Sequence, residues 1–140
     1  MDLVLEAYVS YGSEDDKSIL RLMDLVRKGI KYSGFTELVK SSPFNLSEWS
    51  TYLNLSERTM QRYQKEKTTF GVNHSEKILQ LAMLLRYGNQ VFGSKSKFYL
   101  WLETSNLALA NQKPKSLLDT TFGITFVKDE LTRIEHGVMA

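Results

Sequence analysis

The 140-residue chain has 42% hydrophobic and 24% charged residues, a composition typical of a folded globular protein rather than a disordered one. It contains no cysteine, which excludes disulfides and thiolate metal sites and fits a reducing cytosol. No apolar run is long enough to span a membrane, and residues 1–11 lack the basic residue of a secretory signal. The formal net charge is +2, but residues 56–97 carry a net charge of +5. This asymmetry indicates a central region that faces phosphates or, equally, a solvated basic helical surface.

Helical periodicity dominates the first part of the chain. Ser13 is the expected start of a helix that Gly34 ends. A short second helix is predicted up to the Ser-Ser-Pro sequence at residues 41–43, and two compact helices are predicted between residues 47 and 66. The first helix carries apolar residues at spacings of three and four, namely Ile19, Leu22, Met23, Val26 and Ile30.

The second part of the chain is also predicted to be helical. Ser75 is the expected N-cap of a long apolar helix that Gly93 ends. Residues 121–123 are expected to form a turn, and the last helix is expected to run from about Thr125 to His136. One face of that helix would carry Phe126 or Val127, followed by Leu131 and Ile134.

Periodicity lapses between Phe70 and His74, where a glycine and an asparagine occur. We therefore expect an all-α fold with two domains, residues 1–72 and residues 73–140.

Residues 47–63 meet the requirements of a helix-turn-helix. Ser50 is the small residue where the two helices touch, and Asn54 occupies the turn, where a residue must tolerate positive φ. Ser47 and Ser56 are expected to cap the two helices. The apolar positions are held by Trp49, Leu53, Leu55, Met60 and Tyr63.

The outward face of the second of these helices is predicted to contact DNA. Arginine and glutamine form bidentate hydrogen bonds to guanine and adenine, and serine, threonine and lysine suit phosphates or bases. The alternative is an ordinary helical hairpin with a solvated basic face. The predicted DNA-contacting residues are Ser56, Arg58, Thr59, Gln61, Arg62 and Lys65.

The last eight residues, 133–140, end in apolar side chains beyond Gly137, where we expect the final helix to break. An apolar terminus gains nothing from exposure to water, because chain ends usually fray into solvent. The sequence therefore predicts that this end of the chain inserts into a partner.

The second half of the chain resembles the Xre/MbcA/ParS toxin-binding family. The motifs that carry the resemblance are Val91-Phe92-Gly93, Trp101-Leu102, Asn106-Leu107-Ala108-Leu109, Pro114, Leu117-Leu118-Asp119-Thr120, Gly123, Val127, Leu131 and Arg133-Ile134-Glu135-His136-Gly137-Val138, in this order. The preceding helix-turn-helix resembles the Xre-like DNA-binding part of the same proteins, so the resemblance covers roughly residues 20–140. The chain departs from the family at Ser105, Ala110 and Asn111, where members often have a proline and a pair of glycines.

The resemblance implies an antitoxin of a type II toxin–antitoxin module in the bacterial cytoplasm, paired with a RES-domain toxin that acts on NAD. The C-terminal domain would cover the active-site cleft of the toxin, and the helix-turn-helix would bind operator DNA. A homodimer and higher hetero-oligomers with the toxin are expected, with no cofactor and no membrane partner. The residues expected to bind the toxin are Leu131, Arg133, Ile134, Glu135, His136, Gly137, Val138 and Met139.

Two other functions are weighed against this one. A stand-alone transcriptional regulator would use the second half to dimerise or to sense a ligand. An enzyme would need converging catalytic groups, but the adjacent Glu135 and His136 point about 100° apart on a helix. We therefore assign no catalytic residue and no metal ligand, and expect a protein that is not an enzyme.

Overall fold

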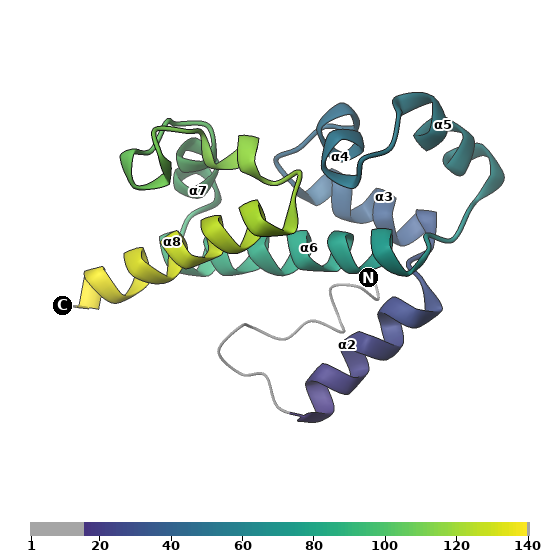
Figure 1. Ribbon diagram of the computed structural model, residues 1–140, viewed down its shortest axis with the longest axis horizontal. Coiled ribbons are helices and arrows are strands. Elements are labelled where there is room, and N and C mark those ends of the chain that lie inside the picture. The colour runs from purple at the N-terminus through teal and green to yellow at the C-terminus, as the bar shows by residue number, and fades with distance from the viewer. Residues whose placement is uncertain (1–15, 140) are drawn as a thin grey trace. The chain divides into compact units, whose positions relative to one another are not determined.

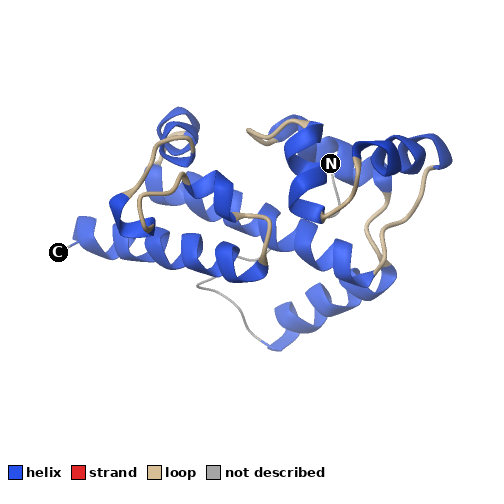
Figure 2. Ribbon diagram, turned by 45° about the horizontal axis from the view of Figure 1, so that its top comes forward, coloured by secondary structure: helices blue, strands red, loops and turns tan. Residues whose placement is uncertain are grey.

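The computed structural model describes residues 16–139, and the side chains of residues 17–137. Within this part of the chain the elements are helices and two short 3-10 turns, with no strand (Figures 1 and 2), which confirms the all-α prediction. No helix among the described residues is long and apolar enough to cross a membrane. The elements are α2 (Asp16–Lys28), α3 (Tyr32–Ser41), α4 (Leu46–Leu53), α5 (Glu57–Glu66), α6 (Val72–Phe92), α7 (Lys95–Leu102), η1 (Leu107–Leu109), η2 (Pro114–Leu117) and α8 (Thr121–Met139).

The chain divides into two compact units, one ending at Met83 and the other beginning at Leu84. Both residues lie inside α6, which begins at Val72 and runs without interruption to Phe92. The predicted domain boundary between residues 72 and 73 coincides with the start of α6. The lapse in periodicity that suggested this boundary marks the connection into the helix.

The core of the first unit is a cluster of aromatic rings. Phe35 is fully buried at its centre and meets Trp49 edge to face, with 5.4 Å between the ring centroids. Phe35 also packs edge to face on Phe70, at 5.1 Å. The indole Nε1 of Trp49 donates a hydrogen bond to the Ser42 hydroxyl at 3.0 Å. Edge-to-face pairs of this kind add stabilisation beyond the area that they bury, so these contacts hold α3, α4 and the segment before α6 together.

Ser75 joins distant segments of the first unit and is not the cap that its sequence context predicts. The helix begins three residues earlier, at Val72, and the buried Ser75 hydroxyl makes two hydrogen bonds to residues outside it. It accepts a hydrogen bond from the backbone N–H of Ile30 at 2.9 Å and donates one to the carbonyl oxygen of Phe70 at 3.1 Å. The same two segments are paired directly, because the Phe70 N–H donates to the Ile30 carbonyl at 2.8 Å.

The predicted end of the first helix at Gly34 is wrong, because α2 ends at Lys28 and Gly34 lies inside α3. The chain turns at Gly29, which has a φ of +90°. A Cβ at this position would lie 2.5 Å from the carbonyl oxygen of Phe70, so glycine is needed for both the conformation and the close approach.

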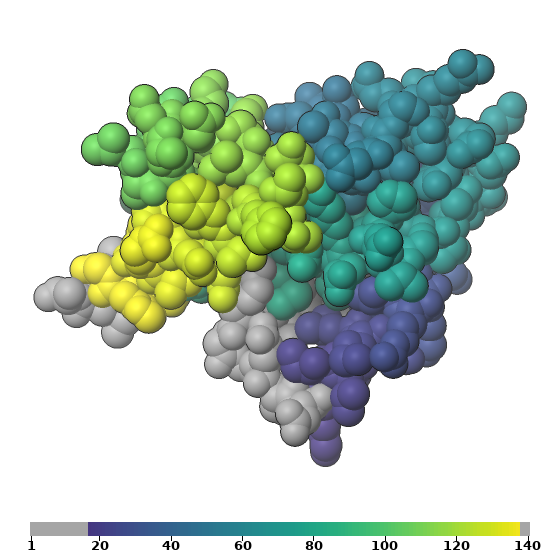
Figure 3. Space-filling model, viewed as in Figure 1, coloured from purple at the N-terminus to yellow at the C-terminus, as the bar shows by residue number. Residues whose placement is uncertain are grey.

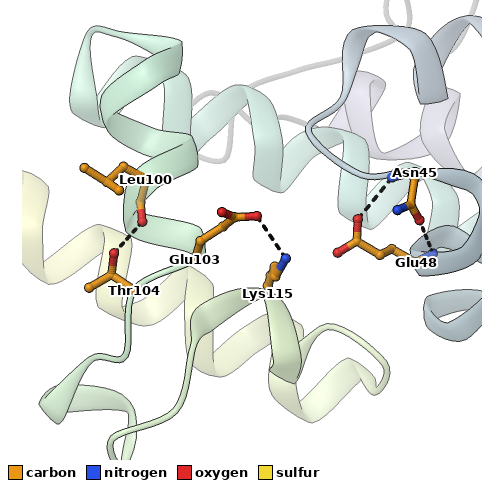
Figure 4. Close-up of polar contacts among 6 residues, drawn as sticks. All are labelled: Asn45, Glu48, Leu100, Glu103, Thr104 and Lys115. Carbon is orange, nitrogen blue, oxygen red and sulfur yellow. Dashed lines mark hydrogen bonds and ion pairs between the residues drawn. The ribbon is translucent and has the colours of Figure 1, made fainter.

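The second unit contains the end of α6 and the elements from α7 to α8. Phe98 of α7 is fully buried and packs against Gly88 of α6, where a Cβ would lie only 2.0 Å from the ring. Gly93 ends α6 with a φ of +67°, as predicted. The Lys115 ammonium of η2 lies 2.9 Å from the Glu103 carboxylate that follows α7 (Figure 4), and this hydrogen bond lowers the pKa of Glu103.

Helix α8 is longer at both ends than the sequence predicts. The expected turn at residues 121–123 is instead its first turn, capped by the Thr120 hydroxyl, which accepts a hydrogen bond from the Gly123 N–H at 3.0 Å. Gly123 is required because a Cβ there would lie 1.6 Å from the Leu117 carbonyl oxygen. The expected break at Gly137 is also wrong. Glycine ends a helix when it adopts positive φ, which Gly137 does not, and its ordinary cost within a helix is only about 1 kcal/mol.

Candidate functional sites

Helices α4 and α5 form the predicted helix-turn-helix. Asn54 ends α4 in the left-handed conformation, with a φ of 57°, as the turn requires. Ser50 is buried, and its carbonyl oxygen accepts a hydrogen bond from the Leu55 N–H at 3.0 Å across the turn. Met60 anchors α5 in the core and is fully buried. The small, turn and apolar positions of the motif are therefore confirmed.

The cap of α4 is Asn45, so the predicted cap at Ser47 is wrong. The Asn45 side chain accepts a hydrogen bond from the Glu48 N–H at 2.8 Å, and the Glu48 carboxylate accepts one from the Asn45 N–H at 3.1 Å (Figure 4). This reciprocal arrangement is a capping box and satisfies two backbone donors at once. The cap of α5 is Ser56, as predicted, and its hydroxyl accepts a hydrogen bond from the Thr59 N–H at 3.0 Å.

The hydroxyls of Ser56 and Thr59 also bond to each other, with 2.9 Å between their oxygens. Both residues lie at the start of α5, whose positive dipole end favours an anion. Their first role is structural, since the bonds hold the N-terminal turn of α5 in place.

The longer polar side chains predicted to contact DNA lie on one exposed face of α5. Arg58, Gln61, Arg62 and Lys65 recur at intervals of three and four residues, and all four are exposed. The Arg62 guanidinium carbon lies 5.6 Å from the centre of the Tyr63 ring, a cation–π geometry that steadies the side chain. This face therefore carries three cations and one amide, the groups suited to phosphates and to guanine and adenine edges.

The toxin-binding residues predicted on α8 do not share one surface. Leu131 is fully buried in the core of the second unit, and Ile134 is half-buried. The Glu135 carboxylate accepts a hydrogen bond from the Tyr87 hydroxyl at 3.0 Å, which links α8 to α6 within this unit. Burial raises the pKa of Tyr87, so the phenol keeps its proton and remains a donor. These side chains thus stabilise the domain itself.

Arg133, His136 and Gly137 are the predicted residues that α8 leaves exposed. The Arg133 side chain is 57% exposed, and its Nε lies 2.8 Å from Oε1 of the mostly buried Glu130. This ion pair orients the guanidinium nearly two turns before the end of the helix. The side chains of Val138 and Met139 lie outside the described residues.

Two exposed phenylalanines on α8 are missing from the predicted set. Phe122 is 89% exposed and Phe126 is 41% exposed, whereas the neighbouring Val127 is fully buried. The sequence left open whether Phe126 or Val127 faces the core, and the structure selects Val127. The signal that could have found the pair is their spacing of four residues, out of phase with Val127 and Leu131.

Comparisons with known proteins assign both units. Residues 21–83 match the antitoxin Xre-like helix-turn-helix domain, and residues 88–137 match the antitoxin Xre/MbcA/ParS C-terminal toxin-binding domain. The chain is 25% identical over 120 residues to a protein named Antitoxin Xre from Yersinia enterocolitica, which covers 85% of this chain and 81% of that protein. It is 26% identical over 104 residues to an Antitoxin Xre from Photorhabdus laumondii, which covers 68% of this chain and 70% of that protein. With the helix-turn-helix and the toxin-binding domain in this order along the chain, the protein belongs to the Xre family of antitoxins.

Proposed function

We propose that this antitoxin neutralises a RES-domain toxin that consumes NAD, by covering the toxin's active site with its C-terminal domain. The observation that carries the proposal is the match of residues 88–137 to a toxin-binding domain that ends in α8. In the last two turns of this helix, Arg133 is an exposed cation suited to a cleft that holds a dinucleotide. Blocking such a cleft is a sufficient mechanism, because the antitoxin then needs no chemistry of its own.

The helix-turn-helix gives the same chain a second task, which is to bind the operator of its own operon. Its support is the exposed row of Arg58, Gln61, Arg62 and Lys65 on α5, behind a helix start capped by Ser56. Helix-turn-helix proteins usually bind two-fold operators as dimers. The antitoxin therefore acts as a homodimer that brings bound toxin to the DNA.

Neutralisation is tested by coexpressing the chain with the product of the adjacent reading frame and measuring growth and cellular NAD. The full chain restores both, whereas a chain ending at Thr132 does not. Far-UV circular dichroism and a gel shift check that the shortened chain is folded and still binds the operator. Failure of the full chain to restore NAD would contradict the proposed function. Full protection by the shortened chain would contradict the role of residues 133–140 but leave the function intact.

Operator binding is tested with the double substitution Arg58→Ala and Arg62→Ala. Because each base contact contributes about 1–3 kcal/mol, the loss of two lowers the affinity for the operator by at least about 30-fold. The matched control removes two exposed lysines elsewhere in the same unit, with Lys17→Ala and Lys40→Ala. Equal affinity of the two double variants in a fluorescence titration would refute the assignment of α5 as the reading helix.

A further inference from the structure

The outer face of α8 carries a stripe of residues that the core of the second unit does not use. Phe122 and Phe126 lie one turn apart, and exposed Asp129 and Arg133 follow at intervals of three and four along the same side. The opposite side of the helix is buried through Ile124, Val127 and Leu131. In the space-filling view, α8 faces the viewer along its length (Figure 3). The spacing of these four residues keeps the stripe on one side of the helix along its axis.

Exposed phenylalanine is unusual enough to need a reason when it occurs in pairs. Single exposed apolar side chains are common on protein surfaces, but contiguous apolar patches mark interaction sites. In the described part of this unit, the exposed large apolar side chains are Leu100, Leu107, Phe122 and Phe126. Phe122 and Phe126 are the two that share one helix and one side of it. They form an apolar centre, and Asp129 and Arg133 form a polar edge.

The backbone beneath Phe122 is held in place before any partner binds. Gly123 approaches the carbonyl oxygen of Leu117 so closely that no Cβ fits, and its N–H donates to the Thr120 hydroxyl. The Phe122 side chain consequently projects from the outer side of a fixed first turn. A preorganised anchor of this kind loses less conformational freedom on binding than one on a mobile loop.

We propose that Phe122 and Phe126 are the anchor by which this antitoxin docks on its toxin, with Asp129 and Arg133 at the rim of the contact. The inference rests on the proposed function and places the main contact at the start of α8, about two to three turns before residues 133–140, which are proposed to enter the cleft. The occupant is the toxin because the stripe lies in the domain that matches a toxin-binding family. Its surface must offer an apolar pocket for two phenyl rings, beside groups that can pair with a carboxylate and a guanidinium.

The surface area that Phe122 and Phe126 can bury is large enough for the centre of an interface but too small for a complete one. An aromatic side chain buries about 150–250 Å² at most. A standard interface buries about 800 Å² on each partner, so the two rings form its centre and other residues complete it. Aromatic residues and arginine are enriched at such centres, and a few of them carry most of the binding energy.

The test compares two matched pairs of exposed apolar residues in the same domain. The variant F122A/F126A removes the proposed anchor, and L100A/L107A removes two exposed leucines outside the stripe. Each variant is titrated calorimetrically against the product of the adjacent reading frame, carrying an inactivating substitution. The anchor variant weakens binding by about 100-fold, and the control by less than about threefold. A second variant, F122E, keeps Phe126 and weakens binding by at least about tenfold, since it places a charge in an apolar pocket.

Thermal unfolding separates binding from folding. Phe122 is so exposed that F122E leaves the melting temperature within about 2 °C of wild type. Wild-type affinity in F122A/F126A and F122E, or equal losses in the anchor and control variants, would overturn the inference while the proposed function stands. Failure of the wild-type chain to bind would overturn both. If analytical ultracentrifugation shows that F122A/F126A dissociates the free antitoxin dimer without weakening toxin binding, the stripe is a contact between copies and the inference is wrong.

Discussion

Replacing Ser75 by alanine removes two buried hydrogen bonds at once. The change deletes the acceptor of the Ile30 N–H and the donor to the Phe70 carbonyl, at 2.9 and 3.1 Å. Each bond contributes about 1 kcal/mol net, and a buried N–H left without a partner adds about 1–3 kcal/mol. We therefore expect S75A to lower the free energy of unfolding by about 3–5 kcal/mol. For a chain of this length, that corresponds to a fall in melting temperature of roughly 10–20 °C.

The measurement is urea unfolding followed by tryptophan fluorescence. Trp49 is fully buried in the same unit as Ser75, whereas Trp101 belongs to the second unit. A Trp101→Phe background therefore makes the signal specific to the first unit. The control is S47A, which removes an exposed hydroxyl of the same kind and should change stability by less than about 0.5 kcal/mol. If S75A and S47A unfold at the same urea concentration with the same slope, the reasoning about Ser75 fails.

The remaining predictions concern helix ends and glycines. N45A should destabilise the first unit by about 0.5–2 kcal/mol, because it breaks the capping box with Glu48. Urea unfolding measures this loss. An equal loss in S47A would instead place the helix cap at Ser47. G123A should lower the melting temperature because its Cβ overlaps the backbone of η2, which costs about 1–3 kcal/mol. G137A should raise the melting temperature, because alanine stabilises a helix by up to about 1 kcal/mol relative to glycine and nothing lies within 4 Å of the new methyl group. A lower melting temperature for G137A would contradict a helix through this residue.

The helix-turn-helix could be predicted from the sequence because its determinants are local. Ser50, Asn54 and Ser56 act on residues within a few positions of themselves, so a short window contains the whole requirement. Side-chain size, tolerance of positive φ and capping capacity are intrinsic properties of these residues. The exposed basic face of α5 follows from the same window, since apolar periodicity determines which side is buried.

The predictions for Ser75 as a helix cap and Gly123 as a turn residue are wrong, because the role of each residue depends on contacts that form only in the folded chain. A serine near the start of a helical pattern looks the same whether it caps the helix or, as Ser75 does, binds a segment 45 residues away. Gly123 suggests a turn, but it serves a close approach to Leu117 that only the folded chain reveals. Leu131 shows the same limit at the predicted toxin-binding site: periodicity placed it on an apolar face without showing whether the core or a partner covers that face.

The two sides of α8 are under different packing constraints. This difference affects how a cell with several related toxin–antitoxin modules could prevent an antitoxin from binding the wrong toxin. Its inner side is constrained by packing, since Val127 and Leu131 cannot change size without loss of stability. Its outer side is less constrained, so substitutions at the almost fully exposed Phe122 leave the fold intact. If the outer side contacts the toxin, a gene duplicate can change partners by mutations confined to that stripe. Cross-reactivity between sibling antitoxins would then be decided by a few surface positions on one helix, independently of the DNA sequence that each one reads.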